Sequence, residues 1–350
     1  MTTSQKSGDD STNIQAGRDI ILANTVALYS IEEVAKQLLN SVFGELPSET
    51  KEKIESNQKS YFQALSDNLE RIVKQNEELK EVVESPDFQY ISKKASVSAS
   101  RSSSVELHKN LSLLIVKRIN CNNEDLKRIV YDEAILTADK LTLDQLKIIT
   151  LSYLLGRTSY QKIVSWETFK DYLNTHIKPF LDFKNTDAEF EHIEYTGCGS
   201  LGLGMISWDL VNIFRENQSF LFFNLIEKNE IEGLELADEI KRNVFALDAK
   251  ENKYFIGSRN KTVLEKYLKE NNVLQETIDK LIAIYQNHIK NNEEIKKKII
   301  EETDIGKKLM DLWEKSGLNR LSLTSVGIAI AISYFEQIVD EKINIDLWIN

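Results

Sequence analysis

Three glycines near the middle of the chain have a spacing that could do chemistry. Gly197-x-Gly199-x-x-Gly202 matches the dinucleotide fingerprint, with a strand expected before it and a helix expected at residues 205–214. In such a turn the glycines let the backbone approach a pyrophosphate at a helix N-terminus. One interpretation is therefore a nucleotide-binding enzyme at Gly197 to Gly202. The other is a glycine-lined turn that lets two elements pack closely, since no alternating series of strands and helices surrounds the motif.

A second candidate for chemistry is the basic segment 91–128. It contains eight basic and three acidic residues, a local charge of +5 in a chain whose net charge is −11. Clustered Lys and Arg side chains bind phosphates, so the segment could serve a nucleic-acid-binding regulator. The alternatives are a solvated helix face or contact with an acidic patch of a partner subunit. The candidate contact residues are Lys93, Lys94, Arg101, Lys109, Lys117 and Arg118.

Metal and nucleophile chemistry have little support in the sequence. The four histidines are scattered, and neither cysteine lies in a zinc-ligand spacing. We therefore predict no catalytic residue, no metal site and no cofactor. Two cysteines give no disulfide framework and fit a reducing compartment. Because the first ten residues are polar and lack the apolar region of a signal peptide, we expect a cytoplasmic protein.

The segment 326–335 organises the expected fold. It is apolar on nearly every position, so no face of a helix formed by it can be left in water. Glu336 and Asp340 close the run well short of the about 20 apolar residues that span a membrane. We expect a central packing helix with Thr324 as its N-cap, a short strand at Leu321 to Leu323 before it, and no membrane span.

Helical signals fill the first half of the chain. Residues 48–83 are predicted as one long helix with a heptad seam that carries Asn76 at an a position. This helix is either a coiled coil between copies or a bundle helix within the chain. Ser85 with Pro86, Ser103 with Glu106, and Thr142 with Gln145 are predicted to start further helices, and Ser165 starts another that is kinked at Pro179.

The second half has mixed signals. Residues 220–226 and 244–257 are strand-like, residues 261–316 are helical, and residues 343–349 alternate like a terminal strand. The predicted fold class is mainly α, a multi-helix bundle with a smaller mixed α/β C-terminal part and a short N-terminal β element. We divide the chain into a disordered or β association element (1–29), a helical domain (30–184) and an α/β C-terminal domain (185–350).

The N-terminal β element at residues 13–22 has no strand near it in sequence. Because an unpaired strand edge recruits another strand, the same element of a second copy is its expected partner, and a flexible tail is the alternative. The predicted oligomerisation residues are Asn13, Ile14, Gln15, Gly17, Arg18, Asp19, Ile20 and Asn76.

Several of these stretches resemble known proteins. The Asn13-Ile14-Gln15-Ala16-Gly17-Arg18-Asp19-Ile20 element resembles a motif carried by many bacterial conflict and anti-phage proteins. Residues 85–118, the turn at 194–199 and residues 323–331 together resemble an uncharacterised bacterial family that bears this motif. The resemblance implies a cytosolic, defence-associated protein whose N-terminal element joins copies or partners. It also implies that the glycine turn is a packing feature.

Taken together, the sequence favours a non-enzymatic, self-assembling interaction or sensor protein of bacterial anti-phage defence. We expect a homo-oligomer, with a phage or host protein as a further partner. The alternatives are the nucleic-acid-binding regulator and the nucleotide-binding enzyme.

Overall fold

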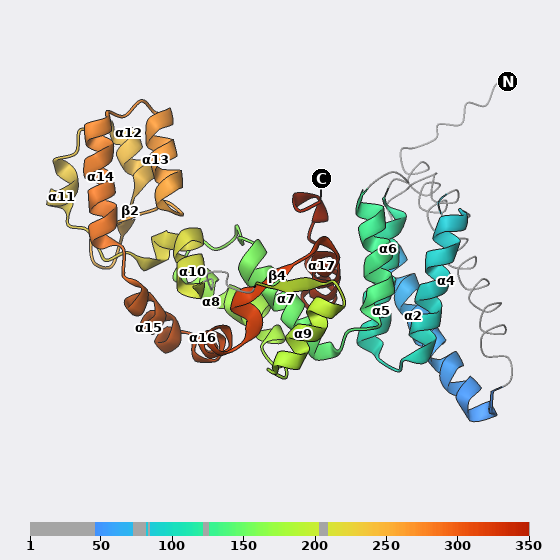
Figure 1. Ribbon diagram of the computed structural model, residues 1–350. Coiled ribbons are helices and arrows are strands. Elements are labelled where there is room, and N and C mark those ends of the chain that lie inside the picture. The colour runs from blue at the N-terminus through green and yellow to red at the C-terminus, as the bar shows by residue number, and fades with distance from the viewer. Residues whose placement is uncertain (1–45, 73–81, 83–84, 122–125, 203–208, 350) are drawn as a thin grey trace, which may run out of the picture. The chain divides into compact units, whose positions relative to one another are not determined.

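The computed structural model describes residues 46–72, 82, 85–121, 126–202 and 209–349. The chain forms two compact units, each discontinuous in sequence (Figure 1). Unit 1 comprises Met1–Thr150, Ala188–Ser200 and Ser322–Asn350, and unit 2 comprises Leu151–Asp187 and Leu201–Leu321. The boundary predicted after residue 184 lies near the return of the chain to unit 1. The last segment, however, belongs with the helices of unit 1, because its apolar helix needs cover on every side.

Unit 1 is a helix bundle, which confirms the predicted mainly α fold. Its elements are α2 (Ser48–Ile72), α4 (Pro86–Arg101), α5 (Val105–Ile119), α6 (Leu126–Ala138), the first half of α7 (Leu143–Arg157), α9 (Asp187–Tyr195), α17 (Ser325–Val339) and the 3-10 turn η5 (Ile345–Leu347). Helix α5 packs against α2, α4, α6 and α17. Among the described residues, no helix is both long and apolar enough to cross a membrane.

Helix α17 is the central packing helix that its sequence predicts. Every residue from 327 to 336 is buried, including Ser333 and Glu336. Thr324 is the N-cap, since its Oγ1 accepts a hydrogen bond from the Gly327 N–H at 3.2 Å. The helix ends at Asp340, whose φ of 59° lies in the left-handed region. The predicted short strand before it is β4 (Leu321–Leu323), which pairs with β1 (Gly199–Leu201).

Capping side chains set the starts of the other helices. Ser85 Oγ accepts from the Phe88 N–H, with proline at the first helical position, as predicted. The Thr142 and Gln145 side chains each accept from the other residue's backbone N–H, which completes the predicted capping box. The cap predicted for α5 was wrong by one residue. Ser104, directly before the helix, accepts from the Leu107 N–H at 3.2 Å, and Ser103 does not cap it.

The apolar seam of helix α2 packs against other helices of the same chain. Leu65 and Leu69 are fully buried in unit 1, where α2 packs against α4 and α5. The described part of the seam therefore acts as a bundle helix. Asn76 and the predicted β element at residues 13–22 lie outside the described residues.

Unit 2 is also mainly helical. Its helical elements are α8 (Trp166–Tyr172), the π-helix η1 (Leu173–Ile177), η2 (Lys178–Phe180), α10 (Leu210–Gln218), η3 (Ser219–Phe222), α11 (Lys228–Glu232), α12 (Asp238–Val244), α13 (Lys261–Glu270), α14 (Gln275–His288), α15 (Asn292–Glu302), α16 (Gly306–Lys315) and η4 (Gly317–Arg320). The helix predicted from Ser165 loses regular α geometry before Pro179, because proline removes a backbone donor and crowds the preceding turn.

A small mixed α/β part lies within unit 2. Strands β2 (Phe245–Asp248) and β3 (Lys253–Ile256) pair antiparallel, as expected for residues 244–257. Their inward side chains share a core with residues of α13 and α14, such as Leu264 and Leu281.

Two predicted strands are wrong. Residues 220–226 begin in the 3-10 turn η3 and form only isolated bridges, at Phe223 with Ile289 and at Ile226 with Tyr254. Residues 343–349 form the helical turn η5, because Ile345 and Ile349 are buried four residues apart while Leu347 between them is exposed. An alternating apolar pattern in so short a segment fits either geometry, and the neighbouring helices decide it.

The start of α17 lies directly against the glycine turn. A Cβ atom on Gly327 would come within 1.9 Å of the Cys198 carbonyl oxygen. The Thr324 N–H donates to the same oxygen at 3.0 Å, and its hydroxyl donates to the Gly197 oxygen at 2.7 Å. Because residue 327 has no Cβ atom, the turn and the helix can come into contact.

We predict that Gly327→Ala destabilises the protein by about 1–3 kcal/mol, since the added methyl meets a backbone oxygen that cannot rotate away. Urea unfolding provides the measurement. Gly156→Ala is the matched control, because Gly156 lies in the last turn of α7 with nothing within 4 Å of an added Cβ. That variant should gain up to about 1 kcal/mol. Equal effects of the two changes would contradict the close contact.

Candidate functional site

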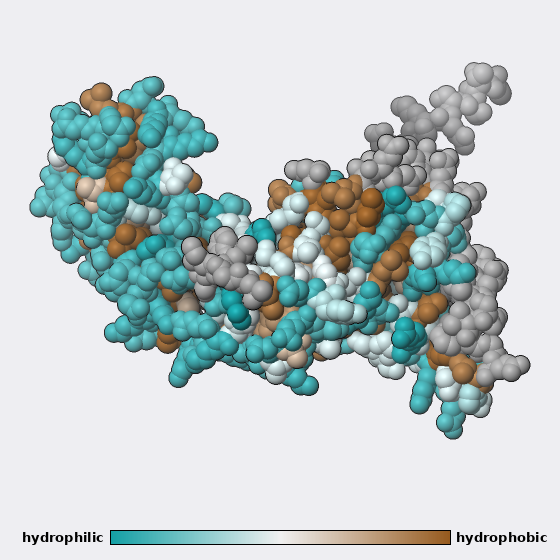
Figure 2. Space-filling model, in the orientation of Figure 1, coloured by the Kyte–Doolittle hydropathy of each residue, from teal (hydrophilic) through white to brown (hydrophobic). Residues whose placement is uncertain are grey.

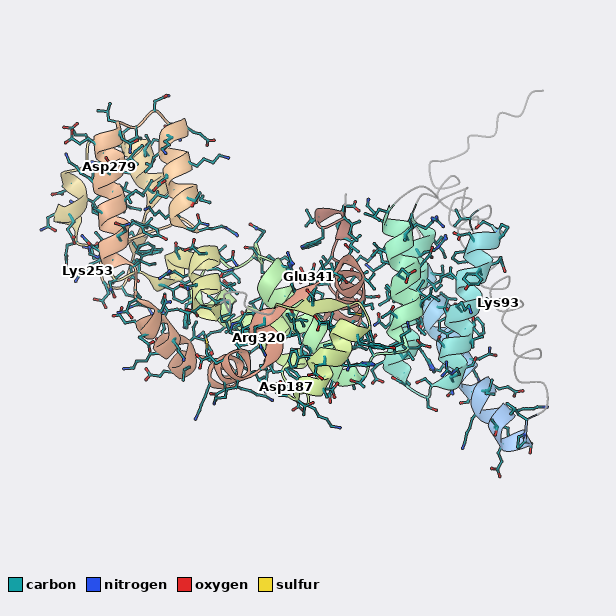
Figure 3. All side chains as sticks on the ribbon, viewed as in Figure 1. Lys93, Asp187, Lys253, Asp279, Arg320 and Glu341 are labelled. Atoms are coloured by element: carbon teal, nitrogen blue, oxygen red, sulfur yellow. The ribbon has the colours of Figure 1, made fainter. Side chains whose placement is uncertain are left out.

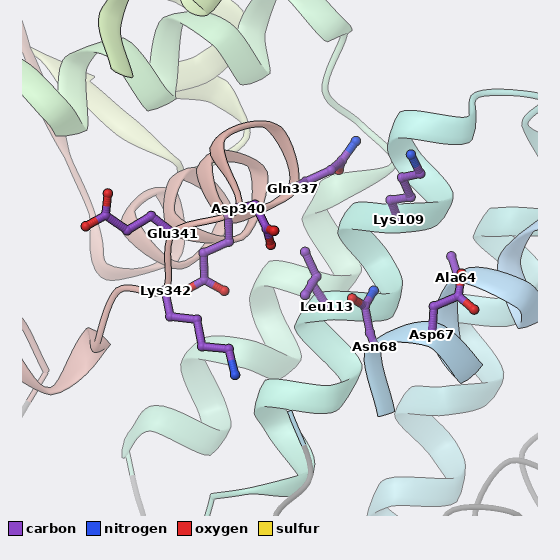
Figure 4. A pocket seen from close by; sticks show the side chains of 10 residues that line it. Ala64, Asp67, Asn68, Lys109, Leu113, Gln337, Asp340, Glu341 and Lys342 are labelled. Carbon is purple, nitrogen blue, oxygen red and sulfur yellow. The ribbon is translucent and has the colours of Figure 1, made fainter. Parts of the chain in front are cut away.

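A polar pocket of about 230 Å³ lies within unit 1, between α2, α5 and the end of α17 (Figure 4). Its walls combine carboxylates, amides and lysines with two small apolar surfaces. The lining residues are Ala64, Asp67, Asn68, Lys109, Leu113, Glu336, Gln337, Asp340, Glu341 and Lys342. These described residues include no histidine, cysteine or hydroxyl side chain. The pocket can therefore hold a polar group by charge and hydrogen bonding.

Glu336 is the most buried acid of this pocket. Its carboxylate accepts hydrogen bonds from Lys117 Nζ and from the Ile343 N–H, each at 2.8 Å. The Lys117 ammonium is itself mostly buried. One carboxylate thus joins α17, α5 and the chain that follows α17. Burial of such a pair is tolerated because both charges are matched and hydrogen-bonded.

The structure divides the predicted nucleic-acid contact residues into two groups. Arg118 has no exposed surface, and Lys117 is committed to Glu336, so neither can reach a phosphate. Arg118 donates to Asp87 and, at 2.9 Å, to Asp132. Burial raises the pKa of the Asp132 carboxyl, although the bond from Arg118 acts in the opposite direction. The four remaining candidates, Lys93, Lys94, Arg101 and Lys109, are exposed.

The glycine turn forms the C-terminal cap of helix α9. Gly197 has a φ of +77°, and its N–H donates to the Glu194 oxygen, while the Cys198 N–H donates to the Ile193 oxygen. These two bonds form a Schellman motif, which ends α9 with a left-handed glycine. The turn follows a helix rather than the strand expected before a dinucleotide fingerprint, and these two N–H groups are already satisfied. The packing interpretation of this turn therefore fits the geometry.

Cys198 and the histidines have structural partners. Burial raises the pKa of the Cys198 thiol, which keeps it protonated near neutral pH. His108 Nε2 donates to the Ala99 and Ser102 oxygens, and its Nδ1 accepts from Ser60 Oγ at 2.9 Å. It thereby joins α2, α4 and α5. No group of three or more His, Cys, Asp or Glu side chains in the described part of the chain could hold a metal ion.

An exposed apolar surface on unit 1 was not predicted. Leu126, Ile129 and Leu347 are 55%, 51% and 75% exposed, and we call them the α6 patch. Figure 2 shows hydrophobic side chains gathered over α6 and the C-terminal end of the chain. Lys127 binds Asp346 at 2.7 Å and so brings η5 to the start of α6. The sequence signal was weak, since α6 also carries buried apolar residues and only the fold separates the two sets.

These features define a mainly helical protein with a polar surface pocket and an exposed apolar patch. A protein-family model described only as ":-like" matches residues 27–349, which is most of the chain. The chain therefore belongs to that family, whose description names no activity, ligand or partner. No curated protein and no solved structure matches the chain.

We predict that Lys117→Met lowers the free energy of unfolding by about 3–5 kcal/mol, because Glu336 would remain buried without its partner. Urea unfolding at neutral pH measures this loss. The control is Lys315→Met, which breaks the exposed pair with Asp311 and should cost less than about 1 kcal/mol. If both variants lost the same stability, the buried pair would not have the structural role given to it here.

Proposed function

We propose that this chain is a non-enzymatic interaction protein that assembles with copies of itself and acts in bacterial anti-phage defence. The observation that carries the assembly part is the α6 patch. Leu126 and Ile129 are exposed one helical turn apart on α6, and the Lys127–Asp346 pair brings the turn that carries the exposed Leu347 to the start of the same helix. Contiguous exposed apolar surface is typical of protein interfaces, whereas single exposed side chains are normal.

The construction of the patch also supports a binding role. Its two halves come from α6 and from η5, more than 200 residues apart in sequence, and the Lys127–Asp346 pair holds them together. The buried side chains of Ile345 and Ile349 anchor the turn η5. The exposed Leu347 between them is therefore held in a fixed position. A preorganised apolar surface binds with a smaller entropy cost than a flexible one.

The defence role and the partner identity rest on sequence. The Asn13 to Ile20 element resembles the motif of conflict and anti-phage proteins, and this resemblance supports a cytoplasmic protein that joins copies, with a phage or host protein as the signal. The polar pocket is the site at which such a signal could be recognised, because its walls come from three chain segments that would move if α17 or α2 shifted.

Light scattering on the purified chain tests the assembly. We expect a mass that is a multiple of 40.2 kDa, and Leu126→Glu with Ile129→Glu should reduce it to a single chain, because a buried charge opposes an apolar interface. The control is Leu274→Glu in unit 2, an exposed lone leucine whose change should leave the mass unaltered. Deleting residues 1–25 separates the contribution of the N-terminal element. A wild-type monomer at high micromolar concentration would refute the assembly role.

The defence role has a separate readout. Cells that express the chain should form fewer phage plaques than cells with the empty vector, and the Leu126→Glu, Ile129→Glu variant should lose this protection. Equal plaque counts for the wild type and the vector across a broad phage panel would contradict defence without touching assembly.

A further inference from the structure

We propose that the outer face of α4 binds single-stranded nucleic acid. Tyr90, Lys93, Lys94 and Arg101 project from one side of this helix, within a sector of about 100° at 3.6 residues per turn. Tyr90 is 55% exposed, and the Arg101 side chain is 68% exposed. Figure 3 shows Lys93 on this face of α4. The stretch from Tyr90 to Arg101 is about 16 Å long at 1.5 Å per residue.

These cations remain available for a ligand. Lys93 forms no ion pair with any described residue, and Lys94 Nζ lies 5.4 Å from the centre of the Tyr90 ring. Arg101 forms a long ion pair with Asp139, with 3.9 Å between its Nη1 and Asp139 Oδ2, and that same oxygen accepts a hydrogen bond from Ser98. This face therefore keeps its positive charge, in contrast to Lys117 and Arg118.

The acid that α4 itself carries is neutralised by arginines of other helices. Asp87 is the single acid of α4, and it accepts from both Arg118 and Arg128. Arg128 also lies 3.7 Å from Asp132. Two acids and two arginines thus form a closed, neutral cluster at the start of the helix. These pairs neutralise Arg118 and Arg128. The positive charge that remains in the segment 91–128 therefore lies mainly on the outer face of α4.

The chemistry of the face favours nucleic acid over an acidic peptide. A base stacks on an exposed aromatic ring while flanking cations bind the backbone phosphates, which is how many proteins hold single strands. An acidic peptide would gain nothing from the Tyr90 ring, and a duplex offers no unstacked base to it. The net charge of −11 repels polyanions from the rest of the surface, so contact is confined to this face. This role is independent of assembly through the α6 patch.

Fluorescence anisotropy with labelled oligo-dT and oligo-rU of about 20 nucleotides tests the proposal. Three phosphate contacts predict a slope of about −2 for the logarithm of the association constant against the logarithm of salt concentration. Lys93→Glu with Lys94→Glu should weaken binding on the order of 50-fold at about 50 mM salt and flatten the slope to about −0.7, the value for one remaining contact. Tyr90→Ala should weaken it roughly tenfold and leave the slope unchanged.

The matched control is Lys51→Glu with Lys53→Glu, which makes the same charge change at two exposed lysines of α2. It should leave the affinity within about threefold, because these lysines lie on α2 and not among the side chains of the α4 face that contact the strand. All changed residues are exposed, and unaltered thermal melts will confirm folding. The proposal is overturned if the wild type shows no salt-dependent binding, or if the control weakens binding as much. Competition by polyglutamate equal to that of the oligonucleotides, with no effect of Tyr90→Ala, would also overturn it in favour of an acidic protein partner.

Discussion

Unit 1 depends on the contact between Gly327 and the Cys198 carbonyl oxygen. The turn can present that oxygen because Gly197 adopts the left-handed conformation that ends α9, and α17 can receive it because position 327 carries no side chain. Two glycines more than a hundred residues apart therefore fix the start of a helix that is buried on every face from residue 327 to residue 336. The helices α5 and α6 pack on α17, so the arrangement of the bundle follows from this approach.

Electrostatic pairing is the second constraint on unit 1. A count along the sequence gives a basic segment at residues 91–128, but acids from distant positions neutralise much of it. Glu336 and Asp346, at the other end of the chain, take Lys117 and Lys127, while Asp87 takes Arg118 and Arg128. Charge that is left unpaired after folding is what a ligand meets. Within the segment 91–128, Lys93 and Lys94 keep such charge on α4, beside a ring on which bases can stack.

Several buried polar groups of unit 1 join helices to one another. His108 connects three helices, Glu336 connects two helices and the chain end, and the glycine turn closes one helix against another. Side chains of types that often serve in catalysis, such as His108 and Glu336, therefore have structural roles in this unit. What the unit offers outward is of three kinds: an apolar patch, a polar pocket and a basic face. Such a set is suited to recognition and assembly, which require complementary surfaces rather than activated side chains.

The mainly helical fold, the buried helix at 326–335 and several helix caps can be predicted from local sequence, because they depend on residues within one or two turns of each other. The strand-like character of residues 244–257 was predicted as well, and the structure shows that they pair as β2 and β3. Three outcomes depend on packing between distant segments: the helical turn at Ile345–Leu347, the burial of the described α2 seam within the chain, and the burial of Arg118 but not of Lys93. Those outcomes depend on which distant helix lies opposite each side chain, and a local pattern carries no information about that neighbour.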